Sequence, residues 1–381
     1  MNFQPSDEQL QLADSLARVL DDHYGFEQRR AIGKTEAGWS QAVWGRLAEL
    51  GVTALGIPEE FGGLGGLGGL SGGAVDRLPV MQAFGRALLL EPYLASCVLG
   101  ATAVREAASL AQKEALLPGV AAGELRLAWA HDEAAGRHAL LWVETRARHT
   151  PEGWRLDGVK SLVLHAAAAG HCVVSARLHG QPDDPDGLLL FLVDARTTGM
   201  SLRTYRLIDD TPAGELSLQD APAQLLGEDG DHARAAAAIR STLAAGTAAV
   251  CADMVGAMEC AFELTTGFVN TRKQFGRLIG EYQALRHRVA DMAVNLEMAR
   301  SMAVAAAVAA DDLAAPGALA DMVRAKLAIG RYARGLCHAA IQSHGGIGMT
   351  EEYAVGHCLR RVHVMDQLFG DEAAQVQRLK P

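Results

Sequence analysis

Two kinds of hydrophobic pattern divide the chain into three parts. Near the N-terminus, Ser6 and Gln9 form a capping-box pattern, and apolar residues then recur at helical spacing over residues 10–20. A second helix is predicted at about residues 40–50, where a glycine follows. Helical character returns over residues 80–116. The first part of the chain is therefore expected to be helical.

After Gly123 the pattern changes to short apolar runs separated by Gly, Pro and Asp. Runs of this length bounded by turn residues are typical of β-strands. Strands that follow one another so closely favour a small β-barrel or sandwich of roughly 100 residues. The predicted strands are residues 125–130, 140–143, 154–156, 163–165, 172–174 and 188–193.

From His232 onward, long alanine-rich segments predict four helices near residues 232–269, 283–312, 318–344 and 351–368. Long helices joined by short loops indicate a four-helix bundle. The fold class is therefore α+β and mostly α. The predicted domains are an N-terminal helical domain (1–122), a middle β-barrel (123–227) and a C-terminal four-helix bundle (228–381).

Composition and charge narrow the classes of partner. The 381 residues are 49% hydrophobic and 21% charged, which is typical of a globular protein. A formal net charge of −10 opposes binding to nucleic acid or to an anionic membrane. The first residues show no signal-peptide pattern, and no apolar run has clear transmembrane character. We expect a cytoplasmic protein without a nucleic-acid or membrane partner.

The six cysteines are spread through the chain without a CxxC pair. The closest two, Cys251 and Cys260, lie inside a predicted helix, where core packing explains them better than zinc binding. We expect reduced thiols and no metal site.

Two sequence blocks carry a family resemblance. The first is Thr271-Arg272-Lys273-Gln274-Phe275-Gly276, and the second runs from Gln342 through Gly345-Gly346 to Tyr353. In this order and at this separation, they resemble the two signature segments of the acyl-CoA dehydrogenases. Within that family the chain is similar to the small subunits of pimeloyl-CoA dehydrogenase. The resemblance implies the three-part fold expected above.

The resemblance also implies FAD as the cofactor. In the family, these two blocks hold the FAD of the neighbouring subunit across a dimer interface. A guanidinium can pair with a pyrophosphate in a forked contact, and adjacent glycines let a ligand approach the backbone closely. Taken singly, the same residues could merely cap or end helices. The residues carried over from the family are Arg272, Gln274, Phe275, Gln342, Gly345 and Gly346.

The family reaction needs a carboxylate base that removes a proton from the α carbon of an acyl thioester. Aligned without gaps from Gln342, the usual position of the base falls on Phe369. A shift of two residues places Asp371 there, with Glu372 within reach, so Asp371 is the candidate base. An earlier position used by some relatives falls on Gly246, which is also no base.

The middle domain departs from the family as well. A family Thr-Glu-Pro run that contacts FAD is replaced by His131-Asp132-Glu133, and a Trp-x-Thr that covers the flavin is replaced by Leu162 and Leu164. Loss of the hydroxyl and the indole removes a hydrogen-bond partner and a stacking face.

The resemblance predicts an FAD-dependent acyl-CoA dehydrogenase, or one subunit of it, that makes a trans-2-enoyl-CoA and passes electrons to an electron-transfer flavoprotein. Pimeloyl-CoA, or another medium-chain or dicarboxylyl thioester, is the expected substrate. The resemblance implies a homodimer or homotetramer, or an α₂β₂ complex with a large acyl-CoA dehydrogenase subunit. Two alternatives remain open: a catalytically incomplete subunit that completes its partner's FAD site, and a flavin monooxygenase of the same fold.

Overall fold

The computed structural model describes residues 7–66, 70, 72–228 and 230–380. By its internal contacts the chain forms two compact units. Unit 1 contains residues 1–30, 77–89 and 247–381, and unit 2 contains residues 31–76 and 90–246. The predicted cap at Ser6 lies outside the described residues. The predicted domain boundaries at 122/123 and 227/228 stay predictions.

The long C-terminal helices confirm the predicted bundle. In the bundle, α8 and α9 pack along each other, and α10 and α11 pack on α9. Alanine-rich sequence favours such long helices because alanine loses no side-chain entropy on helix formation. Their bounds are α7 His232–Thr271, α8 Gln283–Asp311, α9 Ala318–His344, α10 Ala354–Gln367 and α11 Glu372–Arg378.

Two glycines bring α4 (Ala74–Ala87) close to α7. A Cβ atom on Gly85 would lie 1.9 Å from the carbonyl oxygen of Asp253, and one on Gly256 would lie 1.9 Å from that of Gln82. Any larger residue at either glycine would push the two helices apart. Helix α1 (Asp7–His23) also belongs to unit 1, and α2 (Phe26–Gly33) begins there.

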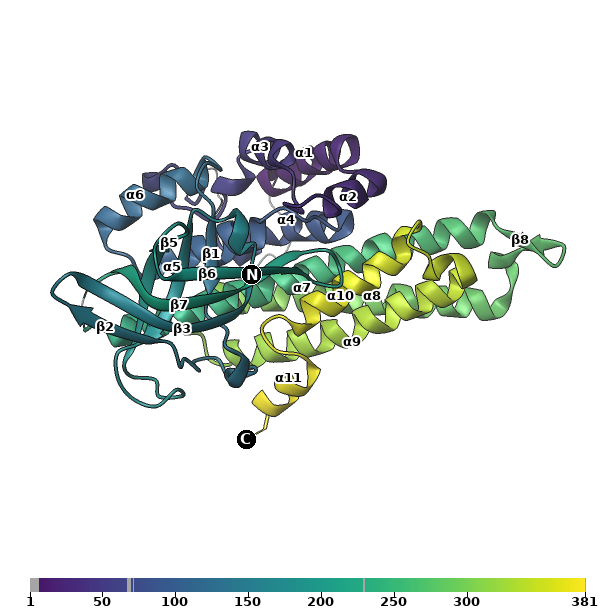
Figure 1. The fold of residues 1–381 in the computed structure, drawn as a ribbon. Coiled ribbons are helices and arrows are strands. Elements are labelled where there is room, and N and C mark those ends of the chain that lie inside the picture. The colour runs from purple at the N-terminus through teal and green to yellow at the C-terminus, as the bar shows by residue number, and fades with distance from the viewer. Residues whose placement is uncertain (1–6, 67–69, 71, 229, 381) are drawn as a thin grey trace. The chain divides into compact units, whose positions relative to one another are not determined.

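A short hairpin extends the end of the bundle beyond α7 (Figure 1). Strand β8 (Lys273–Gln274) pairs with β9 (Arg277–Leu278). The two residues between them, Phe275 and Gly276, have φ angles of 54° and 83°. Positive φ at both central residues is the mark of a tight two-residue hairpin turn, whose twist matches that of the flanking strands.

In unit 2, helix α3 (Gln41–Glu49) confirms the predicted second helix. The Ser40 hydroxyl caps it by accepting from the Val43 amide, and Gly51 follows with φ 75°. The single helical stretch expected over residues 80–116 is instead several helices, because Leu88 takes a left-handed conformation with φ 55° and Ala108 is extended with ψ 153°. These are the end of α4, the π-helix Leu94–Gly100, α5 (Ala101–Ala107) and α6 (Leu110–Ala121).

The middle part of the chain folds into a closed sheet, which confirms the predicted β domain (Figure 1). Its order is β1-β4-β2-β3-β7-β5, β5 pairs back with β4, and β6 pairs with β7. Apolar residues from β1, β2, β3, β4, β5 and β7 fill the interior, among them Leu156, Val174 and Phe191. The strands are β1 Leu127–Ala130, β2 Arg146–Thr150, β3 Gly153–Leu164, β4 His171–Arg177, β5 Leu188–Asp194, β6 Met200–Arg206 and β7 Pro212–Leu225.

Three details of the strand prediction are wrong. Residues 140–143 form turns and irregular backbone. The separate strands expected at 154–156 and 163–165 are the two ends of β3, whose register against β7 shifts twice. Strands β2, β6 and β7 were not predicted, because their exposed charged and polar residues hide the alternation that marks a half-buried strand.

Two helices, α7 and α8, are long and apolar enough to cross a membrane by length and composition alone. The most apolar window of α7 is 83% buried inside the protein, as in the core helix of a globular protein, and that of α8 is 39% buried. Alanine supplies much of this hydropathy, so the two windows are weak support for a membrane span.

Candidate functional site

The six residues predicted to contact FAD lie in one unit of the structure. Three follow the end of α7 or form the β8–β9 hairpin, and three lie in the last turn of α9 and the 3-10 turn after it. All six are exposed, as an intersubunit contact requires. They are Arg272, Gln274, Phe275, Gln342, Gly345 and Gly346.

The hairpin presents a large aromatic ring to solvent. Phe275 is 90% exposed at the tip of the turn. Tyr282 stabilises the hairpin, because its hydroxyl donates to the carbonyl oxygens of Gln274 (3.3 Å) and Phe275 (3.4 Å). The Arg277 guanidinium lies 4.0 Å from the centre of the Tyr282 ring. A braced turn with an uncovered phenylalanine is suited to insertion against another molecule.

The second block offers open backbone beside the end of α9. Gly345 has φ 65°, and a Cβ atom on Gly345 or Gly346 would meet no atom within 4 Å. The Gly345 amide also closes α9 by donating to the carbonyl oxygen of Ile341. The glycines thus end their helix and leave room for a ligand. An exposed guanidinium at Arg272 and this open backbone fit the phosphates of FAD.

The predicted base, Asp371, caps a helix. Its carboxylate accepts a hydrogen bond from the Ala374 amide (2.9 Å) at the start of α11. Glu372 is bonded to Arg331 (2.8 Å) and to Arg334. The hydrogen bond from Arg331, followed by the charges of both arginines, holds the pKa of Glu372 below its ordinary value, which makes it a weaker base. A catalytic role for Asp371 stays a prediction.

Other positions where the family keeps a base hold no free carboxylate. Phe369 is half-buried and has φ 61°, and Gly246 is buried. Asp253, one of the nearby acids on α7, forms a buried two-point ion pair with Arg361 of α10, with N–O distances of 2.8 Å and 2.6 Å. Asp253 therefore links α7 to α10 and is not available as a base.

A cavity of about 830 Å³ lies in unit 1, between α1, α4, α7 and the start of α10. Its wall contains the ion pair between Arg86 and Glu263. Cys260 also lines it, and a hydrogen bond with the Cys358 thiol is the main cause that lowers the pKa of Cys260. Thr271, the residue before Arg272, lies at its edge. The volume suits a small organic ligand.

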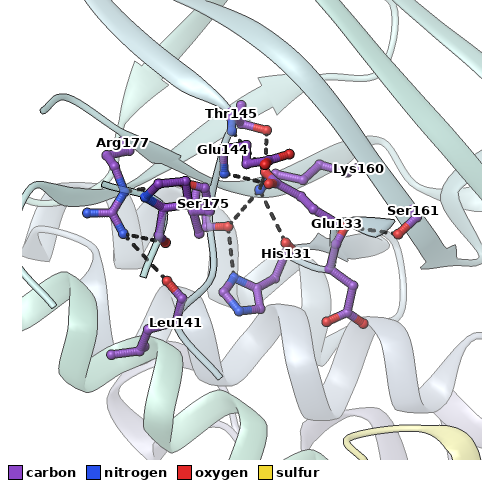
Figure 2. Close-up of polar contacts among 12 residues, drawn as sticks. His131, Glu133, Leu141, Glu144, Thr145, Lys160, Ser161, Ser175 and Arg177 are labelled. Carbon is purple, nitrogen blue, oxygen red and sulfur yellow. Dashed lines mark hydrogen bonds and ion pairs between the residues drawn. The ribbon is translucent and has the colours of Figure 1, made fainter. Parts of the chain in front are cut away.

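Unit 2 contains a buried charge network inside the β domain (Figure 2). Lys160 of β3 is 0% exposed. Its ammonium donates to a Glu133 carboxylate oxygen at 2.7 Å, to the Ser175 hydroxyl at 3.0 Å and to the His131 carbonyl oxygen at 3.2 Å. All three ammonium protons are therefore used, and the buried cation has a buried anion as its partner.

The groups at the two ends of the network, Glu133 and His131, also have hydrogen-bond partners. The Glu133 carboxylate accepts from the amide (3.0 Å) and hydroxyl (2.6 Å) of Thr145. Burial would raise the pKa of Glu133, but the charge of Lys160 and these hydrogen bonds bring that pKa below its ordinary value. At the other end, His131 Nδ1 lies 2.8 Å from the Ser175 hydroxyl, and Nε2 lies 2.9 Å from the Leu140 carbonyl oxygen.

Burial lowers the pKa of His131 to about 4, so its ring is neutral at pH 7. The neutral ring donates from Nε2 to the Leu140 carbonyl and accepts at Nδ1 from Ser175. The hydrogen bonds then run in one direction, from Lys160 to Ser175 to His131. The network is therefore complete within the chain and leaves none of these groups for a ligand.

This part of the β domain does not fit a flavin. His131 and Glu133 occupy the run where the family contacts FAD, and both are held inside the network. Leu162 is half-buried with φ 52°, and Leu164 is buried. Neither offers a hydroxyl or an indole. Sequence reasoning noted the replaced residues but missed the network, because Glu133 and Lys160 are 27 positions apart.

Comparisons with known proteins cover nearly the whole chain. Three segments match parts of one family: the acyl-CoA dehydrogenase N-terminal domain (residues 6–124), middle domain (128–221) and C-terminal domain (236–380). A similar relative is the L-prolyl-[peptidyl-carrier protein] dehydrogenase of Pseudomonas fluorescens, which is 30% identical over 94% of this chain and 93% of its own length.

Solved structures with the same fold include a variant of the Tcur3481-Tcur3483 steroid ACAD. It is 29% identical, has a TM-score of 0.86, and the match covers 98% of this chain and 96% of that one. The ChsE4-ChsE5 complex from Mycobacterium tuberculosis has a TM-score of 0.85 at 23% identity, over 100% of this chain and 98% of that one. At that identity the likeness shows the fold alone.

Proposed function

The chain belongs to the acyl-CoA dehydrogenase family and is an FAD-dependent oxidoreductase that acts on acyl-CoA, and from that premise we propose that it works as one subunit of a heteromeric acyl-CoA dehydrogenase. The assembly is an α₂β₂ complex with a separately encoded large subunit. The reaction removes a proton from the α carbon of a thioester and a hydride from the β carbon, which gives a trans-2-enoyl-CoA. FAD, when bound, accepts the hydride.

The observation that carries this proposal is the contrast between the two halves of the flavin site. The half that reaches a neighbouring subunit is present and exposed, with Arg272 and Phe275 at the hairpin and Gly345 after α9. In the half that would hold the chain's own flavin, His131 and Glu133 are engaged in the buried network of Lys160, and leucines replace the residues that cover the flavin. Such a chain contributes to a partner's site more readily than it completes one.

The position of the catalytic base also supports a heteromeric enzyme. Phe369 stands where the family base is expected, and Asp371 is engaged as a helix cap. In the proposed assembly the large subunit supplies the base and the β-domain contacts to FAD. This chain supplies the Arg272 hairpin and the open glycines.

An exposed apolar face supports association with another subunit. Val294 and Met298 on α8 are 61% and 44% exposed, and Leu319 on α9 is 58% exposed. Val294 and Met298 are four positions apart on α8 and so share one face of that helix, and exposed apolar side chains on one face are typical of an interface. One structure with the same fold is described as a complex of two differently named chains, ChsE4 and ChsE5. An electron-transfer flavoprotein is the proposed electron acceptor.

We propose a medium-chain or dicarboxylyl thioester such as pimeloyl-CoA as the substrate. A steroid-derived thioester is the main competitor, because the name of the 29% identical structure refers to a steroid enzyme. The test is an anaerobic titration of the assembled enzyme with pimeloyl-CoA, octanoyl-CoA and a CoA thioester of a steroid side chain. The flavin absorbance band bleaches when the true substrate is dehydrogenated.

We expect bleaching by pimeloyl-CoA at the lowest concentration. Bleaching by the steroid thioester alone would keep the reaction and change the substrate. If no thioester bleaches the flavin, and oxygen is instead consumed with an aromatic substrate and a reductase, the dehydrogenase function is wrong and the chain is a flavin monooxygenase.

A further inference from the structure

Three side chains of unit 2 form a cluster that neither the flavin site nor the buried network uses. His179 and Asp186 lie in the loop between β4 and β5, and His232 is the first residue of α7. One ligand atom from each lies within 4.8 Å of the other two. The two imidazole rings are 5.2 Å apart and meet at 81°. Among the residues that the structure describes, no other His, Cys, Asp and Glu group meets this criterion.

The buried side chain of Arg177 holds the loop that carries two of these residues. Arg177 is 0% exposed, and its guanidinium donates to main-chain oxygens of the loop. It reaches Pro182 at 2.9 Å, Asp184 at 2.8 Å and Asp186 at 2.5 Å. A buried cation that bonds three carbonyls of one loop fixes the backbone under the side chains. The cluster is therefore built on an ordered support.

Neighbouring groups orient the three side chains. His232 Nδ1 lies 3.2 Å from the Leu188 carbonyl oxygen, so it carries the proton and leaves Nε2 free to bind. Asp186 accepts from the Gly187 amide at 2.9 Å. Gly187 has φ 78°, and a Cβ there would lie 3.0 Å from His179 Nδ1. Glycine is needed for this approach, because any side chain would displace the histidine.

We propose that His179, Asp186 and His232 form a binding site for a divalent transition metal of the Zn²⁺ class. Two neutral imidazoles and one carboxylate suit this class, whereas Mg²⁺ and Ca²⁺ prefer oxygen ligands alone. Metal–ligand bonds of about 2.1 Å in a tetrahedron require ligand atoms about 3.4 Å apart. Small side-chain rotations close the present spacing to that value, and water completes the coordination.

The metal would tie the β4–β5 loop to the first turn of α7. The inference does not depend on the proposed dehydrogenase function, because metal binding is measured without turnover. The site is exposed at His179 and Asp186, so a metal ion can enter from solvent.

The test is calorimetric titration of the chelator-treated protein with Zn²⁺. Wild type is expected to bind one equivalent. His179→Ala, His232→Ala and Asp186→Asn are each expected to weaken binding at least about tenfold. Two matched controls, Asp183→Asn in the same loop and the exposed His287→Ala on α8, are expected to bind like wild type.

Two further measurements separate this site from a thiol site or from misfolding. Co²⁺ should give an absorption spectrum without thiolate charge transfer, and Zn²⁺ should raise the melting temperature of wild type but not of His232→Ala. Far-UV circular dichroism confirms that each variant is folded. The proposal is overturned if wild type binds no Zn²⁺, or if the three ligand variants bind as tightly as wild type.

Discussion

Replacing Lys160 by methionine tests the buried network of the β domain. The substitution keeps most of the apolar stem but removes the ammonium, which leaves the Glu133 carboxylate buried without its cation. Thr145 still donates two hydrogen bonds to that carboxylate. Loss of one partner of a buried ion pair costs about 3–5 kcal/mol. This is a large fraction of the roughly 5–15 kcal/mol by which domains are stable.

The double variant Lys160→Met with Glu133→Gln carries no buried charge. We expect it to lose only about 1–3 kcal/mol, because neutral hydrogen bonds contribute about 1 kcal/mol each. Glu133→Gln alone leaves the lysine ammonium buried without its carboxylate partner and should also cost about 3–5 kcal/mol. The losses in the free energy of unfolding of the two single variants should therefore add up to more than the loss in the double variant. Arg148→Met, which breaks an exposed ion pair with Asp220 on the same domain, should cost less than about 1 kcal/mol.

The assay is urea unfolding followed by tryptophan fluorescence, since three of the five tryptophans lie at positions 129, 142 and 154, within the β domain. Circular dichroism of the same samples checks that the variants are folded before denaturant is added. The reasoning is refuted if Lys160→Met costs no more than Arg148→Met. It is also refuted if the single losses add to the double loss within about 0.5 kcal/mol.

Three further predictions concern single residues. Because the pKa of His131 falls from 6.5 to about 4 on folding, its contribution to stability is complete above pH 6.5 and is lost as the pH falls towards 4. His131→Gln should therefore narrow its stability gap to wild type by about 3 kcal/mol between pH 7 and pH 4. Burial raises the pKa of Asp132 to about 6, which acts in the opposite direction, but that effect is present in both proteins and cancels from the gap. A gap that does not change with pH would contradict a neutral buried ring. Arg272→Ala in the assembled enzyme should weaken FAD binding about 10- to 100-fold, as measured by release of fluorescent flavin on dilution, while Lys273→Ala should change it little; equal effects would remove the specific role of the guanidinium. Asp371→Asn should preserve both the helix cap and turnover, since asparagine caps helices as well as aspartate does, whereas a fall in turnover beyond about 100-fold would identify Asp371 as the base.

Much of the fold is visible in the sequence. The bundle helices were predicted within a few residues of their observed bounds, because α7, α8 and α9 are long alanine-rich segments with turn residues at both ends. Strands β2, β6 and β7 were missed because exposed polar residues hide their alternation, so that pairing with neighbouring strands decides their structure. β7 pairs with β3, β5 and β6, and the local sequence pattern of β7 does not show which strands it pairs with.

The site is visible only in part. Arg272 and Gly345 were predicted because they belong to recognisable motifs; the structure exposes both, and their contact with FAD stays a prediction. The pairing of Lys160 with Glu133 depends on the register of the barrel, which sequence spacing does not reveal. The metal-binding cluster is similar, because His232 is 53 positions from His179 and meets it only where α7 begins beside the β4–β5 loop.

The most direct test of the central claim is the flavin content of this chain purified alone and purified with the proposed, separately encoded large dehydrogenase subunit. The account predicts that the chain alone is colourless, or yellow but not bleached by any thioester. The co-purified α₂β₂ complex is predicted to carry one FAD per pair of unlike subunits and to be bleached by its substrate. A homomeric preparation of this chain with one FAD per chain, bleached by an acyl-CoA without any partner, would contradict the claim.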